Sequence, residues 1–164
     1  MKKLFIDLEK CDKCRECLAE CSYIYHPQNN GITSLREFAT LAVVCHRCED
    51  APCVKSCYHN ALKKDENGIL KRAKMLCTSC KTCSIACPFG VIFPDFLQYF
   101  DSKCNYCISK EKKLCLQTCP YKAIEIIEIE KEDVAQNIYF ASDILAVRHS
   151  QKWFLDDKVL YKKR

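Results

Sequence analysis

The chain has 164 residues, of which sixteen are cysteine and three are glycine, and its formal net charge is +5 at pH 7. Cysteine at this density indicates disulfides or metal sites, because ordinary domains use far less of it. We expect no export signal, because Asp7 and Glu9 interrupt the first apolar residues, and no run is apolar enough to cross a bilayer. These features favour a reducing, cytoplasmic setting, in which clustered cysteines bind metal.

Five short segments are predicted to be extended, because they are apolar or alternate between apolar and charged residues. They are residues 4–8, 61–64, 69–72, 90–93 and 123–129. The second and third flank Asp65-Glu66-Asn67-Gly68, which predicts a hairpin with Gly68 at positive φ.

The residues beyond 130 contain no cysteine and form a predicted C-terminal extension. Glu130 to Ala141 has the apolar spacing of a short helix, whereas Ser142 to Trp153 fits either a helix or a strand. Two roles stay open for this extension. It is a strap over the protein's own core, or it docks a partner subunit through its clustered aromatic residues. These aromatic residues are Tyr139, Phe140, Trp153 and Phe154.

The cysteines fall into four groups of four, and the groups recur about every thirty residues. The groups are Cys11, Cys14, Cys17 and Cys21; Cys45, Cys48, Cys53 and Cys57; Cys77, Cys80, Cys83 and Cys87; and Cys104, Cys107, Cys115 and Cys119. The first and third groups have the spacing C-x2-C-x2-C-x3-C, and the middle gap widens to four residues in the second group and to seven in the fourth.

This spacing is typical of [4Fe–4S] ligation. Two intervening residues let the backbone curl around one corner of a cubane, so that three successive thiolates reach three irons. The fourth cysteine lies about one helical turn further on, and in bacterial two-cluster ferredoxins it ligates the other cluster. Structural zinc instead favours two separated C-x2-C pairs. Radical chemistry on S-adenosylmethionine would need a C-x3-C-x2-C triad, which no group has. The pattern therefore predicts four [4Fe–4S] clusters.

The basic charge does not indicate nucleic-acid binding. Sixteen thiolates contribute about −16 and four oxidised cluster cores about +8, so the loaded protein would carry a net charge of about −3. The lysines and arginines are also scattered, without a nucleic-acid-binding motif. Five of them lie beside cysteines, where they either raise cluster potentials or are solvated surface charges. They are Lys13, Arg15, Arg47, Lys81 and Lys103. We interpret His46, inside the second group, as a neighbour of the cluster and not as a ligand.

Residues 45–53 (CHRCEDAPC), residues 80–90 (CKTCSIACPFG) and the wide fourth group resemble the four-cluster iron–sulfur subunits of molybdenum and tungsten oxidoreductases. That family includes the small subunits of dimethyl-sulfoxide reductase-type enzymes, formate dehydrogenases and formate hydrogenlyase-type complexes. Similar polyferredoxins accompany tungsten aldehyde oxidoreductases. The resemblance covers roughly residues 4 to 129. The chain departs from the motif at Ser22 and Tyr58, where a proline would follow the fourth cysteine.

The resemblance implies an α+β fold with two ferredoxin-like lobes, each holding two clusters and related by a pseudo-twofold axis. Residues 1–43 with 100–129 would form the first lobe, residues 44–99 the second, and residues 130–164 the extension. The implied ligand sets are Cys11, Cys14, Cys17 and Cys119; Cys104, Cys107, Cys115 and Cys21; Cys45, Cys48, Cys53 and Cys87; and Cys77, Cys80, Cys83 and Cys57.

We therefore predict a non-catalytic electron-transfer subunit. It would relay electrons between a large catalytic subunit with a molybdenum or tungsten cofactor, of the aldehyde or formate oxidoreductase type, and an external ferredoxin, hydrogenase or quinone-linked partner. The alternatives are a free polyferredoxin that shuttles between enzymes, a linker in a hydrogenase complex, and a zinc-bound scaffold. Neither nucleic acid nor direct membrane insertion is expected.

Overall fold

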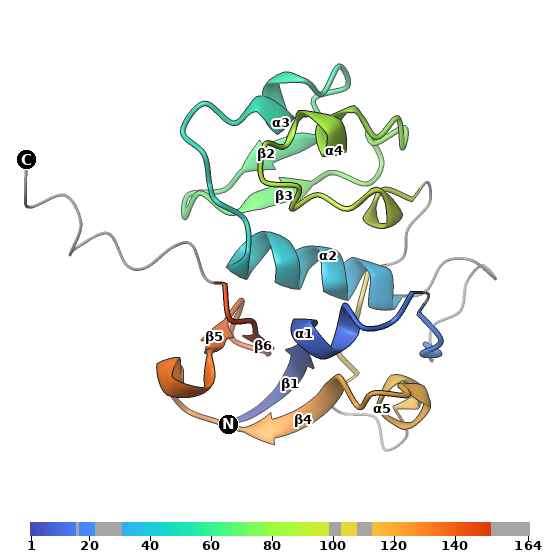
Figure 1. Cartoon of the computed structure of the whole chain (residues 1–164), viewed down its shortest axis with the longest axis vertical. Coiled ribbons are helices and arrows are strands. Elements are labelled where there is room, and N and C mark those ends of the chain that lie inside the picture. The colour runs from blue at the N-terminus through green and yellow to red at the C-terminus, as the bar shows by residue number, and fades with distance from the viewer. Residues whose placement is uncertain (16, 22–30, 99–102, 108–112, 152–164) are drawn as a thin grey trace, which may run out of the picture.

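The elements of this protein lie on two sides of one long helix, α2 (Gly31–Val43). A computed structural model describes residues 1–15, 17–21, 31–98, 103–107 and 113–151. Below α2 in Figure 1 lie a sheet and the short helices α1 (Leu8–Cys11) and α5 (Leu114–Thr118). Above it lie a hairpin and the helices α3 (Pro52–Lys55) and α4 (Thr82–Ala86). Among the described residues, no helix combines the length and the apolar character that crossing a membrane requires.

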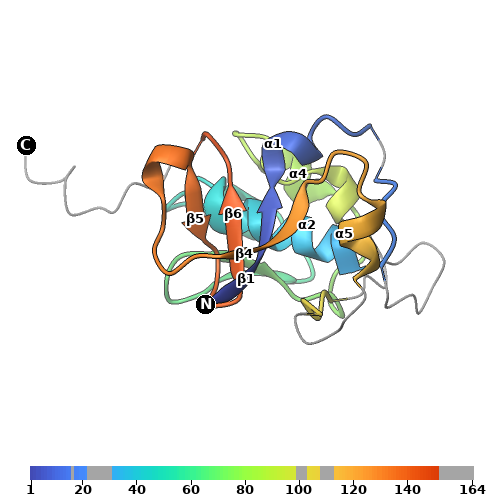
Figure 2. The same cartoon turned by 90° about the horizontal axis from the view of Figure 1, so that it is seen from below.

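The larger sheet joins segments from both ends of the chain. Its strand order is β4-β1-β6-β5, with β1 (Lys2–Asp7) and β6 (Leu145–Arg148) in the centre. β1 pairs antiparallel with β4 (Ile124–Glu128) and parallel with β6. The edge strand β5 (Ile138–Phe140) pairs antiparallel with β6. Figure 2 shows these strands side by side with α2 behind them. The fold is therefore α+β with a mixed sheet.

Alternate side chains of the central strands form the main core. Leu4, Ile6 and Val147 point to one face of the sheet, because successive strand residues face opposite sides. They belong to the same buried cluster as Leu35 and Ala39 of α2. The apolar face of α2 thus covers this side of the sheet, and Cys11 of the first group belongs to the same buried cluster.

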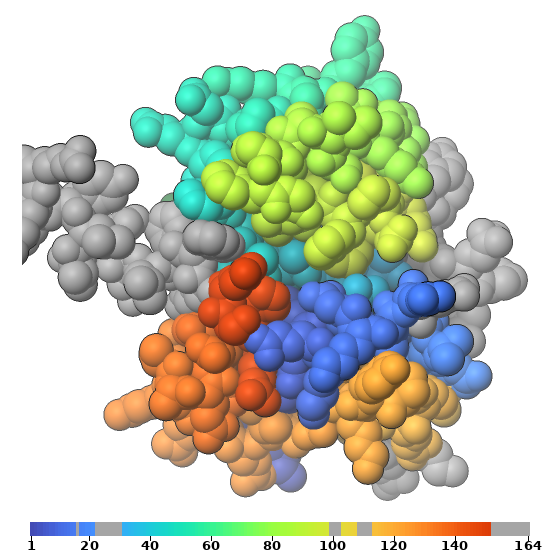
Figure 3. All heavy atoms as spheres, viewed as in Figure 1, coloured from blue at the N-terminus to red at the C-terminus, as the bar shows by residue number. Residues whose placement is uncertain are grey.

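A second, smaller core lies on the other side of α2. Leu41 of α2 packs there with Leu62, Leu70 and Leu97. Leu62 and Leu70 come from the antiparallel strands β2 (Leu62–Lys64) and β3 (Leu70–Arg72). Figure 3 shows the result at the surface: the green segments gather in the upper half and adjoin the lower half, where blue and orange segments lie together.

Most of the predicted strands are confirmed. The structure has β1, the hairpin of β2 and β3, and β4, and Gly68 in the hairpin turn has a φ of +72°. The extended segment expected at residues 90–93 forms no strand. Gly90 takes a φ of +63°, and the 3-10 helix η1 begins at Pro94 (Pro94–Phe96). Val91 and Ile92 are buried there, so their apolar character reflects packing rather than strand pairing.

The helix predicted for Glu130 to Ala141 is wrong. Only the short 3-10 helix η2 (Val134–Gln136) forms there, where the Asp133 side chain accepts a hydrogen bond from the backbone of Gln136. Asn137 then takes a left-handed conformation, which ends the turn and starts β5. Pairing with β6 stabilises this short strand, which the residue spacing alone does not reveal.

The open alternative at Ser142 to Trp153 is settled for Leu145–Arg148, which form the strand β6. Tyr139 is buried in the main core, and the Lys3 ammonium lies 4.2 Å from the centre of the Phe140 ring. This part of the extension is therefore built into the sheet, and the role of the whole extension as a strap or a docking element stays a prediction. Trp153 and Phe154, on which the docking alternative also depended, lie outside the described residues.

Gly31, the first residue of α2, sits against the fourth cysteine group. A Cβ at this position would lie 3.0 Å from the Cα and 3.3 Å from the backbone nitrogen of Cys104. Such distances are tighter than ordinary van der Waals contact, and the atoms they involve belong to the backbone. The absence of a side chain therefore allows α2 to approach the segment that carries Cys104.

We expect Gly31→Ala to destabilise the folded protein by about 1–3 kcal/mol, the usual range for overpacking. At an ordinary helix position the same change stabilises by about 0.5–1 kcal/mol, so the sign of the effect is informative. Thermal unfolding of anaerobically prepared protein measures it. A higher melting temperature in the variant would show that Cys104 does not restrict this position.

Candidate iron–sulfur centres

All sixteen cysteines lie in the described ranges, and none forms a disulfide. One cavity of about 400 Å³, partly open to solvent, is lined by Cys45, Cys48 and Cys53 of the second group and by Cys87 of the third. Cys45 follows α2, α3 carries Cys53, and Cys87 comes directly after α4, so the packing of α3 against α4 brings the two groups together.

A second cavity is lined by cysteines of the same two groups in the opposite proportion. It encloses about 340 Å³ of space, open solvent included, and is lined by Cys77, Cys80 and Cys83 of the third group and by Cys57 of the second. The two middle groups therefore each contribute three cysteines to one cavity and one cysteine to the other.

The first and fourth groups are also interleaved. Cys11, Cys14 and Cys17 line a cavity together with Cys119, and it encloses about 340 Å³ of space, open solvent included. The remaining four thiols lie close to one another: burial, together with the nearby Cys104, Cys21 and Cys107, raises the pKa of Cys115 to about 11. The structure thus brings the sixteen thiols together in the four sets that the resemblance implied. That each set binds a cluster stays a prediction.

The backbone of the cysteine loops is curled more tightly than ordinary loops. Several residues other than glycine have positive φ there, among them Arg47, Ser79 and Lys81. Such turns point successive N–H groups toward one side, which favours bound negative charge. Some N–H groups already donate to sulfur: that of Ala61 lies 3.3 Å from Cys57 Sγ, and that of Ala123 lies 3.3 Å from Cys119 Sγ.

The donor chemistry fits an iron–sulfur cluster. Burial raises the pKa of Cys11 to about 12 and that of Cys83 to about 11. Several thiolates gathered in such sites need a compensating cation, and soft thiolate donors select zinc, copper(I) or iron–sulfur clusters. Among the described residues, no three histidine, cysteine or acidic side chains stand close enough to share a single metal ion. When bound, a cluster supplies one-electron transfer at a potential set by nearby charge, hydrogen bonds and exposure.

His46 and Phe89 cover the cavity around Cys45. Their rings stack with centroids 4.1 Å apart and planes 2° apart, and both residues line that cavity. Arg47 lines it too, but its guanidinium donates to the backbone carbonyl groups of Ala42 and Asn67. His46 is thus a stacked neighbour of the cysteines, and part of the charge of Arg47 is engaged by backbone oxygens.

The structure adds a functional candidate that sequence reasoning missed. Arg72 lines the cavity of Cys57, Cys77, Cys80 and Cys83, although it lies five residues before the third group begins. Its charge is paired with Glu37 of α2. No sequence signal connects these two residues, because only the packing of β3 against α2 makes them neighbours.

This arrangement of cysteine sets is that of an iron–sulfur protein, and comparison with known families agrees. Residues 36–129 match the model of the 4Fe-4S dicluster domain, so the chain is a member of this family. The protein YsaA of Escherichia coli (strain K12), whose name describes electron transport, is 33% identical over 143 residues, with 78% of this chain and 90% of that protein covered.

Two further relatives are named as parts of reductases. One polypeptide of the anaerobic dimethyl sulfoxide reductase of Escherichia coli (strain K12) is 27% identical, with 77% of this chain and 73% of the relative covered. The thiosulfate reductase electron transfer subunit PhsB of Salmonella typhi is 27% identical, with coverage of 78% and 76%. The resemblance to iron–sulfur subunits of oxidoreductases is confirmed, and so is the expectation of a non-catalytic electron-transfer subunit.

The interleaved sets predict which substitutions act together. Cys53→Ala and Cys87→Ala should remove the same paramagnetic signal, because both thiols line one cavity, whereas Cys83→Ala should remove a different one. Electron paramagnetic resonance of the reduced, anaerobically purified variants distinguishes the signals. Ser84→Ala, placed between Cys83 of α4 and Cys87 just after this helix, should keep every signal. Identical spectra for Cys83→Ala and Cys87→Ala would contradict the pairing.

Proposed function

We propose that the chain carries four [4Fe–4S] clusters and relays single electrons between a catalytic subunit with a molybdenum or tungsten cofactor and an external carrier. The observation that carries this proposal is the distribution of all sixteen cysteines over four sets of four. Each set would hold one cluster: Cys11, Cys14, Cys17 and Cys119; Cys21, Cys104, Cys107 and Cys115; Cys45, Cys48, Cys53 and Cys87; and Cys57, Cys77, Cys80 and Cys83.

The proposal includes two ferredoxin-like lobes related by a pseudo-twofold axis. Matching details on the two sides of α2 support it. Cys57 and Cys119, each the last cysteine of its group, accept a hydrogen bond from the N–H group of the alanine four residues later. Both alanines are buried, and a strand begins directly after each, β2 after Ala61 and β4 after Ala123.

A protein partner is supported by apolar side chains exposed beside one cysteine set. Tyr58, Met75 and Ile85 are 91%, 89% and 86% exposed. Each lies within two residues of Cys57, Cys77 or Cys83, which line the same cavity. Large exposed side chains of this kind mark interaction sites when they gather. We infer that a partner covers this region and exchanges electrons with the nearest cluster.

The catalytic partner is inferred from the named relatives, which are a polypeptide of dimethyl sulfoxide reductase and an electron transfer subunit of thiosulfate reductase. The aldehyde or formate substrate expected from the resemblance stays a prediction, as does a location in the cytoplasm.

Metal analysis after anaerobic purification tests the cluster number. We expect about sixteen irons per chain and a brown protein whose absorbance falls on reduction, since each cubane holds four irons. Fewer than about twelve irons after reconstitution would mean that one set does not hold a cubane. Zinc in place of iron would support the scaffold alternative.

Purification from the native host distinguishes a dedicated subunit of one enzyme from a free polyferredoxin that shuttles between enzymes. A dedicated subunit should elute together with one large protein that contains molybdenum or tungsten. A chain that elutes alone, as a stable iron-loaded monomer, would favour the free polyferredoxin.

A further inference from the structure

Arg72, the last residue of β3, lies between two cysteine sets. It lines the cavity around Cys57, Cys77, Cys80 and Cys83. It also lines a larger pocket of about 1080 Å³, partly open to solvent, between α2, β3 and the segment that carries Cys104. Its side chain is only 1% exposed. A fixed positive charge therefore stands in a buried position at the wall of a proposed cluster site.

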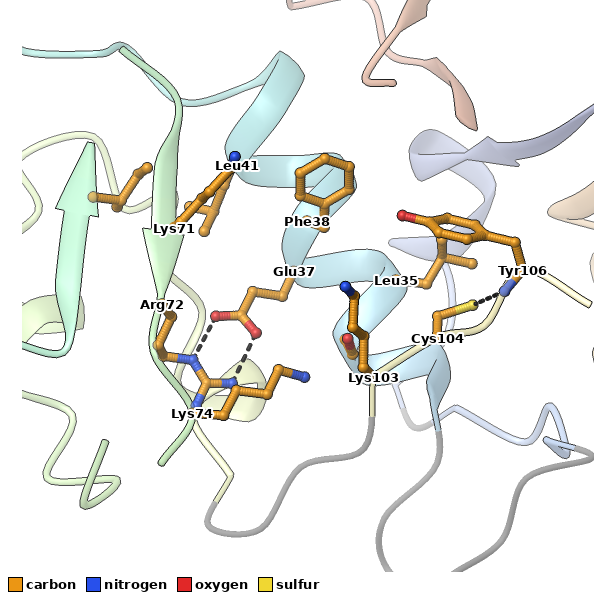
Figure 4. A pocket seen from close by; sticks show the side chains of 12 residues that line it. Leu35, Glu37, Phe38, Leu41, Lys71, Arg72, Lys74, Lys103, Cys104 and Tyr106 are labelled. Atoms are coloured by element: carbon orange, nitrogen blue, oxygen red, sulfur yellow. Dashed lines mark hydrogen bonds and ion pairs between the residues drawn. The ribbon is translucent and has the colours of Figure 1, made fainter. Parts of the chain in front are cut away.

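The guanidinium is held in one orientation from several sides. Its Nε donates to Oε1 of Glu37 at 2.5 Å, and one terminal nitrogen donates to Oε2 at 2.7 Å. The same terminal nitrogen donates to the backbone oxygen of Phe96 at 2.9 Å. Figure 4 shows the Glu37 carboxylate on α2 in direct contact with the Arg72 guanidinium, with Cys104 and Tyr106 at the right. A planar fork bound in this way cannot easily turn away from the cavity.

The arginine also reaches the cysteine set directly. Burial would lower the pKa of Arg72, but hydrogen bonds and charges from Glu37, and then from Cys77, raise it above its ordinary value. The side chain is thus cationic at any pH at which the protein is folded. Glu37 lines the larger pocket and Arg72 lines both, so the pair presents its positive end to the cysteines.

We propose that Arg72 is a positioning residue that sets the reduction potential of the cluster held by Cys57, Cys77, Cys80 and Cys83, and that Glu37 limits how much of its charge acts there. The proposal rests on the proposed function, because it needs a cluster in that set. One-electron reduction adds one negative charge, which a neighbouring cation stabilises. Burial of the pair reduces screening by water and salt, so the effect is larger than that of a surface lysine.

Two substitutions should shift the potential in opposite directions. Arg72→Gln removes the cation and should lower the ratio of reduced to oxidised cluster about tenfold at a fixed ambient potential, or about 59 mV for one electron. Glu37→Gln leaves the cation uncompensated and should raise that ratio. Arg72→Lys keeps the charge and should stay closer to the wild-type value than Arg72→Gln does.

Redox titration with dye mediators and dithionite, followed by electron paramagnetic resonance at low temperature, measures these shifts. The relevant signal is the one that Cys83→Ala lacks. Lys71→Gln is the matched control: Lys71 precedes Arg72 on β3, but its side chain is 58% exposed and pairs with Asp65 at 2.9 Å. It should leave the potential unchanged, because exposed charges are screened.

Thermal unfolding of the same samples separates this role from a structural one. If both glutamine variants unfold more easily but keep the wild-type potential, the ion pair only joins β3 to α2 and the proposal is overturned. If Arg72→Gln fails to retain the cluster, the other two variants, Glu37→Gln and Arg72→Lys, test the proposal. A potential lower than that of the wild type in Glu37→Gln would then overturn the proposal. Absence of any cluster from the wild-type protein would instead refute the proposed function.

Discussion

In the described part of the chain, three cavities are each lined by three cysteines of one group and one cysteine of another, and this arrangement ties distant parts of the chain together. Cys87 completes the set of the second group, and Cys119 completes that of the first, 98 residues after Cys21. A cluster in such a cavity would cross-link its two segments. Metal binding is then part of folding, because the thiols come together only in the folded chain. The chain has few glycines and mostly short helices, so little apart from bound metal would fix the conformation of these loops.

Helix α2 is the element against which both halves are placed. Ile32, Leu35 and Ala39 pack into the core between α2 and the sheet, whereas Leu41 belongs to the other core. Its first residue lies against Cys104, and its Glu37 is paired with Arg72 of the hairpin. A buried ion pair contributes little net stability compared with apolar packing, but loss of one partner is costly. Its value here is in fixing the position and sign of a charge beside the cysteines.

The sequence revealed those features that depend on local spacing. The cysteine groups, the hairpin turn at Gly68 and the strands β1 and β4 follow from short patterns, and the ligand sets were implied by resemblance alone. The strand β5 was missed because its partner β6 stabilises it, not its own periodicity. Arg72 and Glu37 were missed for a similar reason, since they lie 35 residues apart and meet only through tertiary packing.

The two halves differ in how much of their stability can come from the chain itself. The lower half has a four-stranded sheet, completed by β5 and β6 beyond the last cysteine, with Leu145, Ala146 and Val147 fully buried. The upper half has a two-stranded hairpin and a small core, and a structure of that size is marginal without additional constraints. Its exposed Tyr58 and Ile85 also flank the cysteines that line one cavity. The upper half would therefore depend more on a bound cluster, and it also exposes apolar side chains beside its cysteines, so the folding of this half, its cluster loading and its docking should be coupled.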